Sequence, residues 1–257
     1  MKNILSALLI FISFLGNAQI KYYSVSNAHS HNDYRNSTPF YKAFREGFGS
    51  IEADVFPRQG KLLVAHDKED LDSSKTLNSL YLDPILEELS KNPKRKLRLL
   101  IDIKENHLEI LPILMKALEP LRTFLSTARA QKQLQIVISG NRPKPADFHS
   151  YPDYVFFDHD LSVELTPEQA RRVGLVSVSF TKFSKWDGVG VLPAADEQRV
   201  RAVIDSAHQL KKEFRFWAVP DTEKAWLMQM KLGADVIGTD RIEDLGKMLK
   251  RLSKGQH

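Results

Sequence analysis

The chain has 257 residues, of which 42% are hydrophobic and 27% are charged. This composition is that of a folded protein with a sizeable core, and it excludes a largely disordered chain. The formal net charge of +5 favours anionic ligands, but the basic residues are spread along the sequence, so we expect no nucleic-acid partner. The absence of cysteine excludes disulfides, thiolate metal sites and a cysteine nucleophile.

Residues 1–18 form a pattern typical of a secretory signal peptide. A basic start is followed by an apolar run over residues 4–15, and small residues precede the expected cleavage point after Ala18. An uncleaved membrane anchor is the alternative, but the run is shorter than the roughly 20 apolar residues needed to span a membrane. We therefore predict a cleaved signal peptide, a secreted or periplasmic protein, and no integral membrane segment after cleavage.

Strand-like and helix-like segments alternate through the rest of the chain. The sequence predicts strands at residues 22–28, 50–55, 61–65, 97–103, 134–139, 154–157, 175–180, 214–219 and 236–239. It predicts helices at residues 40–46, 80–91, 107–128, 196–212, 222–231 and 241–252, and another that begins at Pro167.

This alternation defines the expected fold class, α/β. Strands separated by helices imply parallel pairing with right-handed crossovers, and about eight principal strands close a TIM-type (β/α)8 barrel. We predict one barrel domain over residues 19–257, and we expect it to be a monomer. In such barrels functional side chains lie at the carboxyl ends of the strands.

Acidic residues occur at the end of the predicted second strand. Glu52 and Asp54 are two positions apart, so a strand points both to the same face. Two carboxylates inside a barrel repel each other, and a hard divalent cation such as Mg²⁺ or Ca²⁺ removes the repulsion. A surface pair on a half-exposed strand is the alternative, but apolar Ile51 and Val55 on the other face indicate burial. Asp102, which faces the barrel from the next parallel strand, is a candidate third ligand.

Histidines follow two of the predicted strands. His29 ends the first strand and His66 ends the hairpin strand. Imidazoles give and take protons near neutral pH, so a pair of them can provide general acid and general base catalysis. His31 lies two residues from His29 and competes for its role.

Other polar or aromatic residues at strand ends are candidate substrate contacts. Lys104 shares a strand face with Asp102, which suits either a contact to a phosphate oxygen or an internal ion pair. His31, Arg142 and Trp217 are further candidates for substrate binding. Asp240 precedes the last predicted helix and is expected to cap it.

These motifs resemble the signature of the glycerophosphodiester phosphodiesterase family, within the phosphatidylinositol phospholipase C-like superfamily. The matching residues are His29, the Glu-Ala-Asp of 52–54, the Val-Ala-His-Asp of 64–67 and the Gly-Ala-Asp-Val-Ile-Gly-Thr-Asp of 233–240. The resemblance implies that His29 and His66 are the acid–base pair. It also implies that Glu52, Asp54 and Asp102 bind Ca²⁺ or Mg²⁺.

Residues 29–34 (His-Ser-His-Asn-Asp-Tyr), 51–55 and 76–84 resemble more closely the altered inheritance of mitochondria protein 6 family. The usual His-Arg-Gly motif reads His-Ser-His here, so the arginine that would contact phosphate is missing. The resemblance implies hydrolysis of a glycerophosphodiester or phospholipid-type substrate, which is a small-molecule or lipid phosphodiester.

Three other functions stay open at this point. Asp102-x-Lys104 together with Trp217 is similar to phospholipase D-type toxins, which cleave choline phospholipids. A barrel that binds the metal without turnover is a second possibility. A glycosidase with paired carboxylates is the third, although Glu52 and Asp54 are close together for the two opposed roles.

Overall fold

The computed structural model describes residues 22–254. The predicted signal peptide, residues 1–18, lies outside this range. Within residues 22–254, no helix has both the length and the apolar character that crossing a membrane requires.

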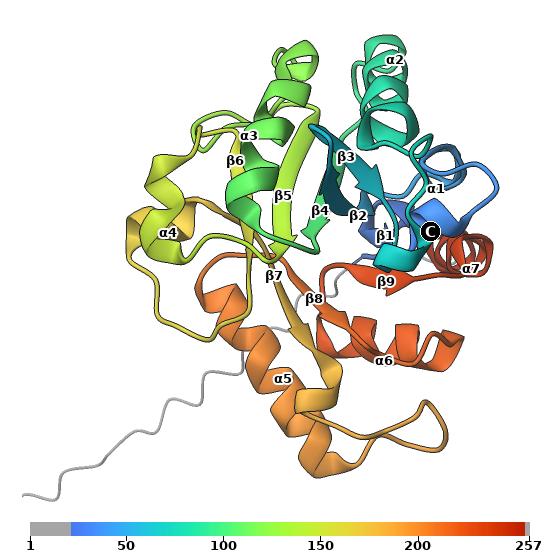
Figure 1. Ribbon diagram of the computed structural model, residues 1–257. Helices are drawn as coiled ribbons and strands as arrows, with labels where there is room; N and C mark the ends of the chain where they lie inside the picture. Colours follow the sequence, from blue (N-terminus) through green and yellow to red (C-terminus); the bar gives the residue numbers. More distant parts are fainter. Residues whose placement is uncertain (1–21, 255–257) are drawn as a thin grey trace, which may run out of the picture.

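Eight parallel strands form the wall of a nearly closed barrel, in the order β8-β7-β6-β5-β4-β2-β1-β9 (Figure 1). Their bounds are β1 Ala28–Ser30, β2 Ser50–Arg58, β4 Leu97–Ile103, β5 Leu134–Gly140, β6 Val155–His159, β7 Val173–Ser179, β8 Phe214–Trp217 and β9 Ile237–Thr239. A further strand, β3 (Lys61–Val64), pairs antiparallel with β2 outside this path. Within the described residues, β8 meets the β9 side through one isolated bridge between Arg215 and Val236. The TIM-type barrel predicted from the sequence is confirmed.

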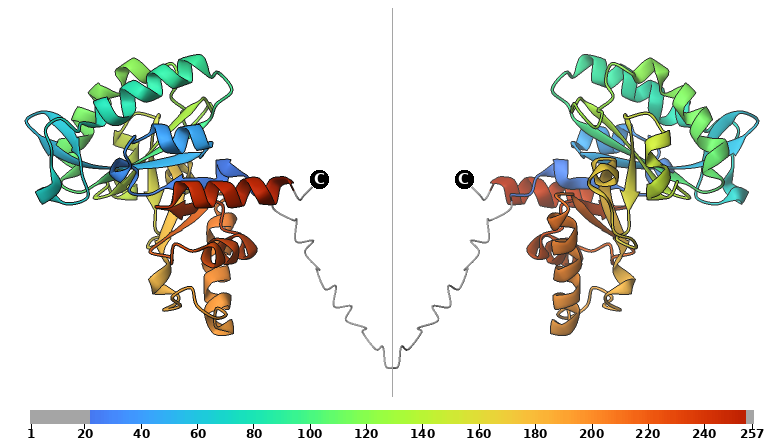
Figure 2. Two further views of the ribbon diagram at one scale, coloured as in Figure 1. Left: turned by 90° about the vertical axis from the view of Figure 1, so that its right-hand side faces the viewer. Right: turned by 90° about the vertical axis from the view of Figure 1, so that its left-hand side faces the viewer.

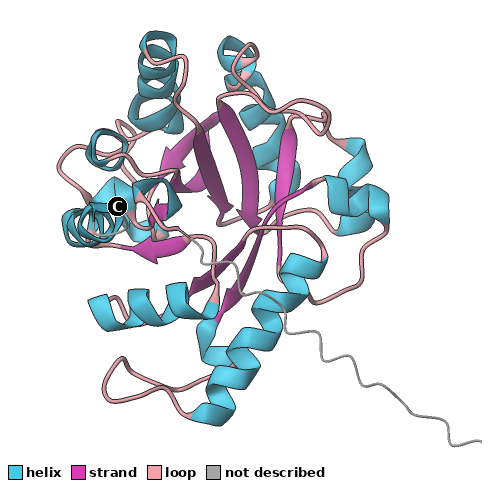
Figure 3. Ribbon diagram, turned by 180° about the vertical axis from the view of Figure 1, so that it is seen from behind, coloured by secondary structure: helices cyan, strands magenta, loops and turns pink. Residues whose placement is uncertain are grey.

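Helices surround this wall on the outside, as the view from behind in Figure 3 shows. Their bounds are α1 Tyr41–Glu46, α2 Asp83–Lys91, α3 His107–Ala117, α4 Pro167–Arg171, α5 Ala194–Gln209, α6 Glu223–Leu232 and α7 Ile242–Lys254. A 3₁₀ helix, Pro145–Ser150, takes the place of an α-helix between β5 and β6. The side views in Figure 2 show α2 and α5 on opposite sides of the molecule.

The core has two parts because strand side chains alternate between the two faces of the wall. The outward faces, represented by Ile51, Ile101 and Ile136, pack against the helices in one large cluster. A second cluster fills the barrel interior, and we call it the apolar plug; it consists of Leu100, Val137, Phe156, Leu175 and Val236. The polar side chains of β2 and β4 lie above this plug, toward the carboxyl ends of the strands.

The strand predicted at residues 22–28 is wrong, because a local hydrogen-bond pattern competes with it. Residues Val25–Asn27 form a 3₁₀ turn. The Ser24 hydroxyl accepts a hydrogen bond from the Ser26 N–H, and the Asn27 side chain accepts one from the Ser24 N–H. Serine and asparagine commonly divert the backbone in this way. The first barrel strand is therefore β1, which begins three residues before His31.

The helix predicted at residues 107–128 is also too long. It ends at Ala117, and the chain continues as a 3₁₀ turn, Glu119–Leu121. Pro120 lies in this turn, and proline has no N–H with which to continue an α-helix.

Candidate active site

Three acidic side chains converge at the carboxyl ends of β2 and β4. Asp54 and Asp102 are paired in register on the adjacent strands, and Glu52 lies one pleat earlier on β2. One carboxylate oxygen from each residue lies within 4.8 Å of the others. Glu52 and Asp54 are buried, and Asp102 is half-buried. Three clustered oxygen donors are a ligand set that Mg²⁺ or Ca²⁺ accepts. We call these three residues the acidic cluster.

The Lys104 ammonium lies against two members of the acidic cluster. Its Nζ is 2.8 Å from Asp54 Oδ2 and 2.6 Å from Asp102 Oδ2. Burial disfavours the ammonium, but the charges of Asp102 and Asp54 outweigh burial and raise the pKa of Lys104. Burial and the neighbouring charge of Glu52 raise the pKa of Asp54 despite this lysine. The acidic cluster thus attracts positive charge, and the Lys104 ammonium supplies part of that charge.

Glu52 is paired across the barrel interior with Arg215 of β8. The Arg215 guanidinium donates to Glu52 Oε2 at 2.8 Å, and both side chains are buried. Burial alone would raise the pKa of Glu52, but Arg215 and a hydrogen bond with His29 hold it well below its usual value. Glu52 is therefore ionised, with a permanent cation beside it.

His29 lies below the barrel mouth and is fully buried. Its Nδ1 is 2.8 Å from the Ser50 hydroxyl, and its Nε2 is 2.7 Å from Glu52 Oε2 and also contacts Arg215. Burial, followed by the charge of Arg215, lowers the pKa of His29 to about 3. The ring is therefore neutral near pH 7, and both of its nitrogens have partners within the protein.

His31 lies at the rim of the mouth, with 41% of its side chain exposed. Its Nδ1 is 2.7 Å from Asp240 Oδ1, and the Asn32 amide donates to Asp240 Oδ2 at 3.1 Å. Burial lowers the pKa of His31, but the bond to Asp240 and nearby negative charge outweigh it, so the pKa is raised. The prediction that Asp240 caps the last helix is wrong, because α7 begins at Ile242 and the carboxylate turns toward His31 instead.

His66 lies on the other side of the acidic cluster, with 39% of its side chain exposed. Its Nδ1 is 3.2 Å from the Tyr34 hydroxyl and 3.3 Å from Asp54 Oδ2. The Tyr34 hydroxyl is also 2.8 Å from Asp54 Oδ2 and 2.8 Å from Asn32 Oδ1. Burial and the Asp54 charge raise the pKa of Tyr34, so its hydroxyl keeps its proton. A hydrogen-bond chain through Asn32 and Tyr34 thus joins the surroundings of His31 and His66.

Two of the predicted substrate contacts lie at strand ends away from the acidic cluster. Trp217 ends β8 and is 49% exposed. Arg142 follows β5, and its guanidinium is 3.7 Å from Asp160 Oδ1. Within residues 22–254, neither side chain forms a hydrogen bond or an ion pair with the acidic cluster. Both remain candidates for contact with a bound substrate.

Sequence reasoning missed the part that four side chains play in this site: Asn32, Tyr34, Arg215 and Asp240, the last of which was expected only to cap a helix. Asn32 and Tyr34 belong to the His-Ser-His-Asn-Asp-Tyr segment, and membership of this motif was the sequence feature that could have identified them as site residues. Arg215 is two residues from Trp217 on β8, so strand geometry gives both side chains the same face. No local pattern identifies Glu52 as its partner, because the two lie on different strands far apart in the sequence.

Comparison with known proteins gives a consistent family resemblance. Residues 21–96 match the model of the AIM6-like phosphodiesterase domain. The chain resembles the AIM6-like phosphodiesterases. It is 27% identical to an altered inheritance of mitochondria protein 6 homolog from Arthroderma benhamiae over 83% of this chain and 81% of that protein. It is 26% identical to altered inheritance of mitochondria protein 6 from Saccharomyces cerevisiae over 87% of this chain and 67% of that protein. The resemblance predicted from the motifs is confirmed.

A solved structure supports the fold. A glycerophosphodiester phosphodiesterase from Parabacteroides distasonis superposes with a TM-score of 0.57 at 14% identity. The match covers 89% of this chain and 98% of that one. At this identity the likeness establishes a common barrel architecture, and activity has to be argued from the site itself.

Proposed function

We propose that this protein is a metal-dependent phosphoric diester hydrolase acting on a glycerophosphodiester or phospholipid-type substrate. The observation that carries the proposal is the acidic cluster, whose three carboxylates have oxygens within 4.8 Å of one another at the mouth of a phosphodiesterase-like barrel. Solvent-accessible histidines flank this cluster. Carboxylate oxygens that bind a cation, next to histidines that transfer protons, form an arrangement suited to in-line displacement at phosphorus.

Glu52, Asp54 and Asp102 are the residues that would hold the cation, Mg²⁺ or Ca²⁺. The ion, when bound, supplies Lewis-acid polarisation of a phosphoryl oxygen. The donor set supports this choice, because burial and mutual repulsion raise the pKa of Asp54 even beside Lys104. Lys104 is also placed to offset the negative charge that develops on the phosphoryl oxygens.

His66 is the proposed proton-transfer group on one side of the phosphorus. Its Nδ1 is directed toward oxygens of Tyr34 and Asp54, an arrangement in which Nδ1 carries a proton and donates it. This tautomer leaves the Nε2 lone pair to accept a proton from an attacking water or hydroxyl. In the reverse sense, the doubly protonated ring protonates the leaving alkoxide.

The second proton-transfer group is a histidine at the end of β1. The family resemblance assigns this role to His29. The geometry favours His31, because its ring is exposed and oriented by Asp240, whereas His29 is buried with both nitrogens engaged. An aspartate that fixes the orientation of an imidazole is a recurrent feature of acid–base sites.

The deciding experiment compares His29→Ala, His31→Ala and His66→Ala on bis(p-nitrophenyl) phosphate in the presence of Mg²⁺ or Ca²⁺. His149→Ala is the matched control, because His149 is exposed on the segment after β5. Loss of one acid–base group should lower kcat by about 10²–10⁴. A large loss in His31→Ala with little change in His29→Ala assigns the pair His31 and His66, and the reverse result assigns His29 and His66. Near-wild-type turnover in all three variants would refute acid–base catalysis by histidine.

Chelation separates the proposal from the other classes. EDTA should abolish turnover, and added Mg²⁺ or Ca²⁺ should restore it. A typical glycosidase would be insensitive to EDTA and active on glycosides. A protein that binds the cation yet hydrolyses none of bis(p-nitrophenyl) phosphate, glycerophosphodiesters and lysophospholipids is a metal-binding module.

The exposed Trp217 favours a second candidate, hydrolysis of choline phospholipids. A half-exposed indole at the end of β8 offers a face to a quaternary ammonium group. Trp217→Ala should then raise KM for lysophosphatidylcholine and leave KM for bis(p-nitrophenyl) phosphate unchanged. An equal change for both substrates contradicts the choline assignment.

Export forms part of the proposal. The predicted signal peptide supports it, because it ends in small residues before Gln19. Amino-terminal sequencing of the exported protein should begin at Gln19. A mature protein that retains Met1 would contradict cleavage.

A further inference from the structure

The amino end of the barrel, opposite the candidate active site, carries a concentration of positive charge. A hollow of about 600 Å³ opens there, and residues at or before the amino ends of strands β1, β2, β4, β5, β7, β8 and β9 line it. Two carboxylates line it, those of Glu213 and Asp235. Seven cationic side chains also line it: Lys96, Arg98, Arg129, Lys132, Arg171, Lys211 and Lys212. We call this feature the basic hollow.

The cations of the basic hollow are largely uncompensated. Arg98 forms an ion pair with Glu213, and Asp235 is bonded to His208 at 2.8 Å. Within residues 22–254, the other six cations of the hollow form no ion pair with a carboxylate. Lys96 donates to the backbone carbonyl of Lys132 at 2.9 Å, and this bond leaves its charge uncompensated. Like charges gathered around one hollow repel, so an anion bound there gains from several of them at once.

The hollow is separate from the acidic cluster. Phe156 and Val236 belong both to its lining and to the apolar plug that fills the barrel interior. The acidic cluster lies on the other side of this plug, at the carboxyl ends of β2 and β4. An anion in the basic hollow therefore cannot contact the residues proposed for hydrolysis.

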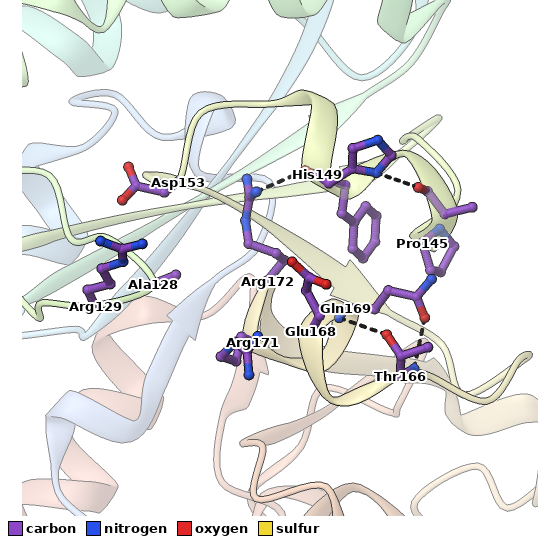
Figure 4. A pocket seen from close by; sticks show the side chains of 12 residues that line it. Ala128, Arg129, Pro145, His149, Asp153, Thr166, Glu168, Gln169, Arg171 and Arg172 are labelled. Atoms are coloured by element: carbon purple, nitrogen blue, oxygen red, sulfur yellow. Dashed lines mark hydrogen bonds between the residues drawn. The ribbon is translucent and has the colours of Figure 1, made fainter.

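An adjoining hollow of about 510 Å³ shows the contrast (Figure 4). It shares Arg129 and Arg171 with the basic hollow, but Asp153 and Glu168 also line it. Its third arginine, Arg172, is directed at the protein and donates to backbone carbonyls, including that of Pro152 at 2.6 Å. Two carboxylates and three arginines thus line the adjoining hollow, whereas two carboxylates and seven cations line the basic hollow.

We propose that the basic hollow binds a small polyanion that carries two or more phosphate groups. Its volume is that of a small-molecule site, and a hollow encloses a compact ligand better than it fits a flat membrane surface. The Gln135 side chain accepts a hydrogen bond from Arg98 through its oxygen, and its amide N–H groups are the ones that can donate to a phosphate oxygen. The cations come from the segments at the amino ends of β4, β5, β7 and β8 and line one hollow, whereas a nucleic-acid strand requires a continuous track.

The test is calorimetric titration with tripolyphosphate at low ionic strength in EDTA. The test variant carries Arg129→Gln, Lys132→Gln and Arg171→Gln, which remove three exposed charges. The matched control carries Lys224→Gln, Lys231→Gln and Lys247→Gln, which remove three exposed charges from α6 and α7. A third protein, Lys104→Gln, reports binding at the candidate active site. Equal thermal midpoints for the two triple variants show that both are folded.

We expect the unmodified protein to bind tripolyphosphate, and the test variant to bind it about tenfold or more weakly. The control and Lys104→Gln should bind as the unmodified protein does. The proposal is overturned if tripolyphosphate does not bind, or if Lys104→Gln loses binding while the test variant keeps it. It is also overturned if phosphatidylserine vesicles or a single-stranded oligonucleotide bind and tripolyphosphate does not. Hydrolytic activity is a separate readout, so a failure here leaves the proposed function unaffected.

Discussion

His31 and Asp240 are 209 positions apart in the sequence, and their side chains meet at the barrel mouth with Nδ1 2.7 Å from Oδ1. The contact follows from the pairing of β1 with β9, which sets Ser30 opposite Thr239. The residue after each strand end then lies beside the other. A carboxylate so placed favours the charged imidazolium and fixes the orientation of the ring.

Replacement of Asp240 should therefore lower the pKa of His31. In Asp240→Asn the imidazolium loses its charged acceptor, while burial, which disfavours the charge, remains. NMR titration of the His31 ring protons measures the change. Asp244→Asn is the control, because it removes a nearby exposed carboxylate that is paired with Arg241. An unchanged His31 pKa in Asp240→Asn would contradict the pairing.

Removal of the Lys104 ammonium should increase the affinity of the acidic cluster for a divalent cation. Lys104 lies within 2.8 Å of Asp54 and 2.6 Å of Asp102, so it competes with a bound ion for the same oxygens. Calorimetry with Mg²⁺ and Ca²⁺ should show about tenfold tighter binding by Lys104→Gln. Glu52→Gln should bind the ions weakly, because it loses one of three ligands. Equal affinity in all three proteins would mean that the ion is bound elsewhere.

Loss of the Tyr34 hydroxyl should lower kcat with little effect on folding. The hydroxyl bonds to Asp54 and lies 3.2 Å from His66 Nδ1, so Tyr34→Phe releases the orientation of that ring. A lost hydrogen bond of this kind is worth about 1 kcal/mol, or roughly fivefold in rate. Tyr41→Phe on α1 is the matched control and should retain full turnover. A Tyr34→Phe protein with unchanged kcat would assign the hydroxyl a structural role only.

Stability should depend on pH through Asp158. Burial raises the pKa of this carboxyl from 3.8 to about 7, although Arg215 opposes the change. Between these values the folded state binds a proton that the unfolded state lacks, so stability falls as pH rises from about 4 toward 7. The slope reaches at most about 1.4 kcal/mol per pH unit. Urea unfolding from pH 4.5 to 8 should show this slope in the wild type and its reduction in Asp158→Asn. Identical slopes in the two proteins would contradict the raised pKa.

Most of the acidic cluster could be predicted from the alternation of side chains along a strand. Glu52 and Asp54 share a face of β2 because side chains alternate along a strand, and the same rule placed Asp102 and Lys104 inside the barrel. Ile51 and Val55 pack in the cluster between the strands and the helices, as expected for the outer face. These inferences needed only neighbouring residues, which is why the sequence was sufficient.

The remaining contacts depend on how the barrel closes. Arg215 meets Glu52 across the interior, and Asp240 meets His31 only after β9 pairs with β1. Neither contact has a local pattern. The depth of His29 below the rim was unpredictable for the same reason, because it depends on where β1 begins, and Ser24 with Asn27 set that point.

The bond between Glu52 and Arg215 also has a mechanical consequence. Backbone pairing between β8 and β9 is limited, within the described residues, to the isolated bridge at Arg215. The side chain of that same residue forms an ion pair with Glu52 of β2. This ion pair holds β8 to the rest of the barrel at the point where backbone hydrogen bonds are fewest. Removing the Glu52 charge would then weaken the contact between β8 and β9 as well as the acidic cluster. Amide exchange in β8 should accelerate in Glu52→Gln while the central strands β4 and β5 remain protected.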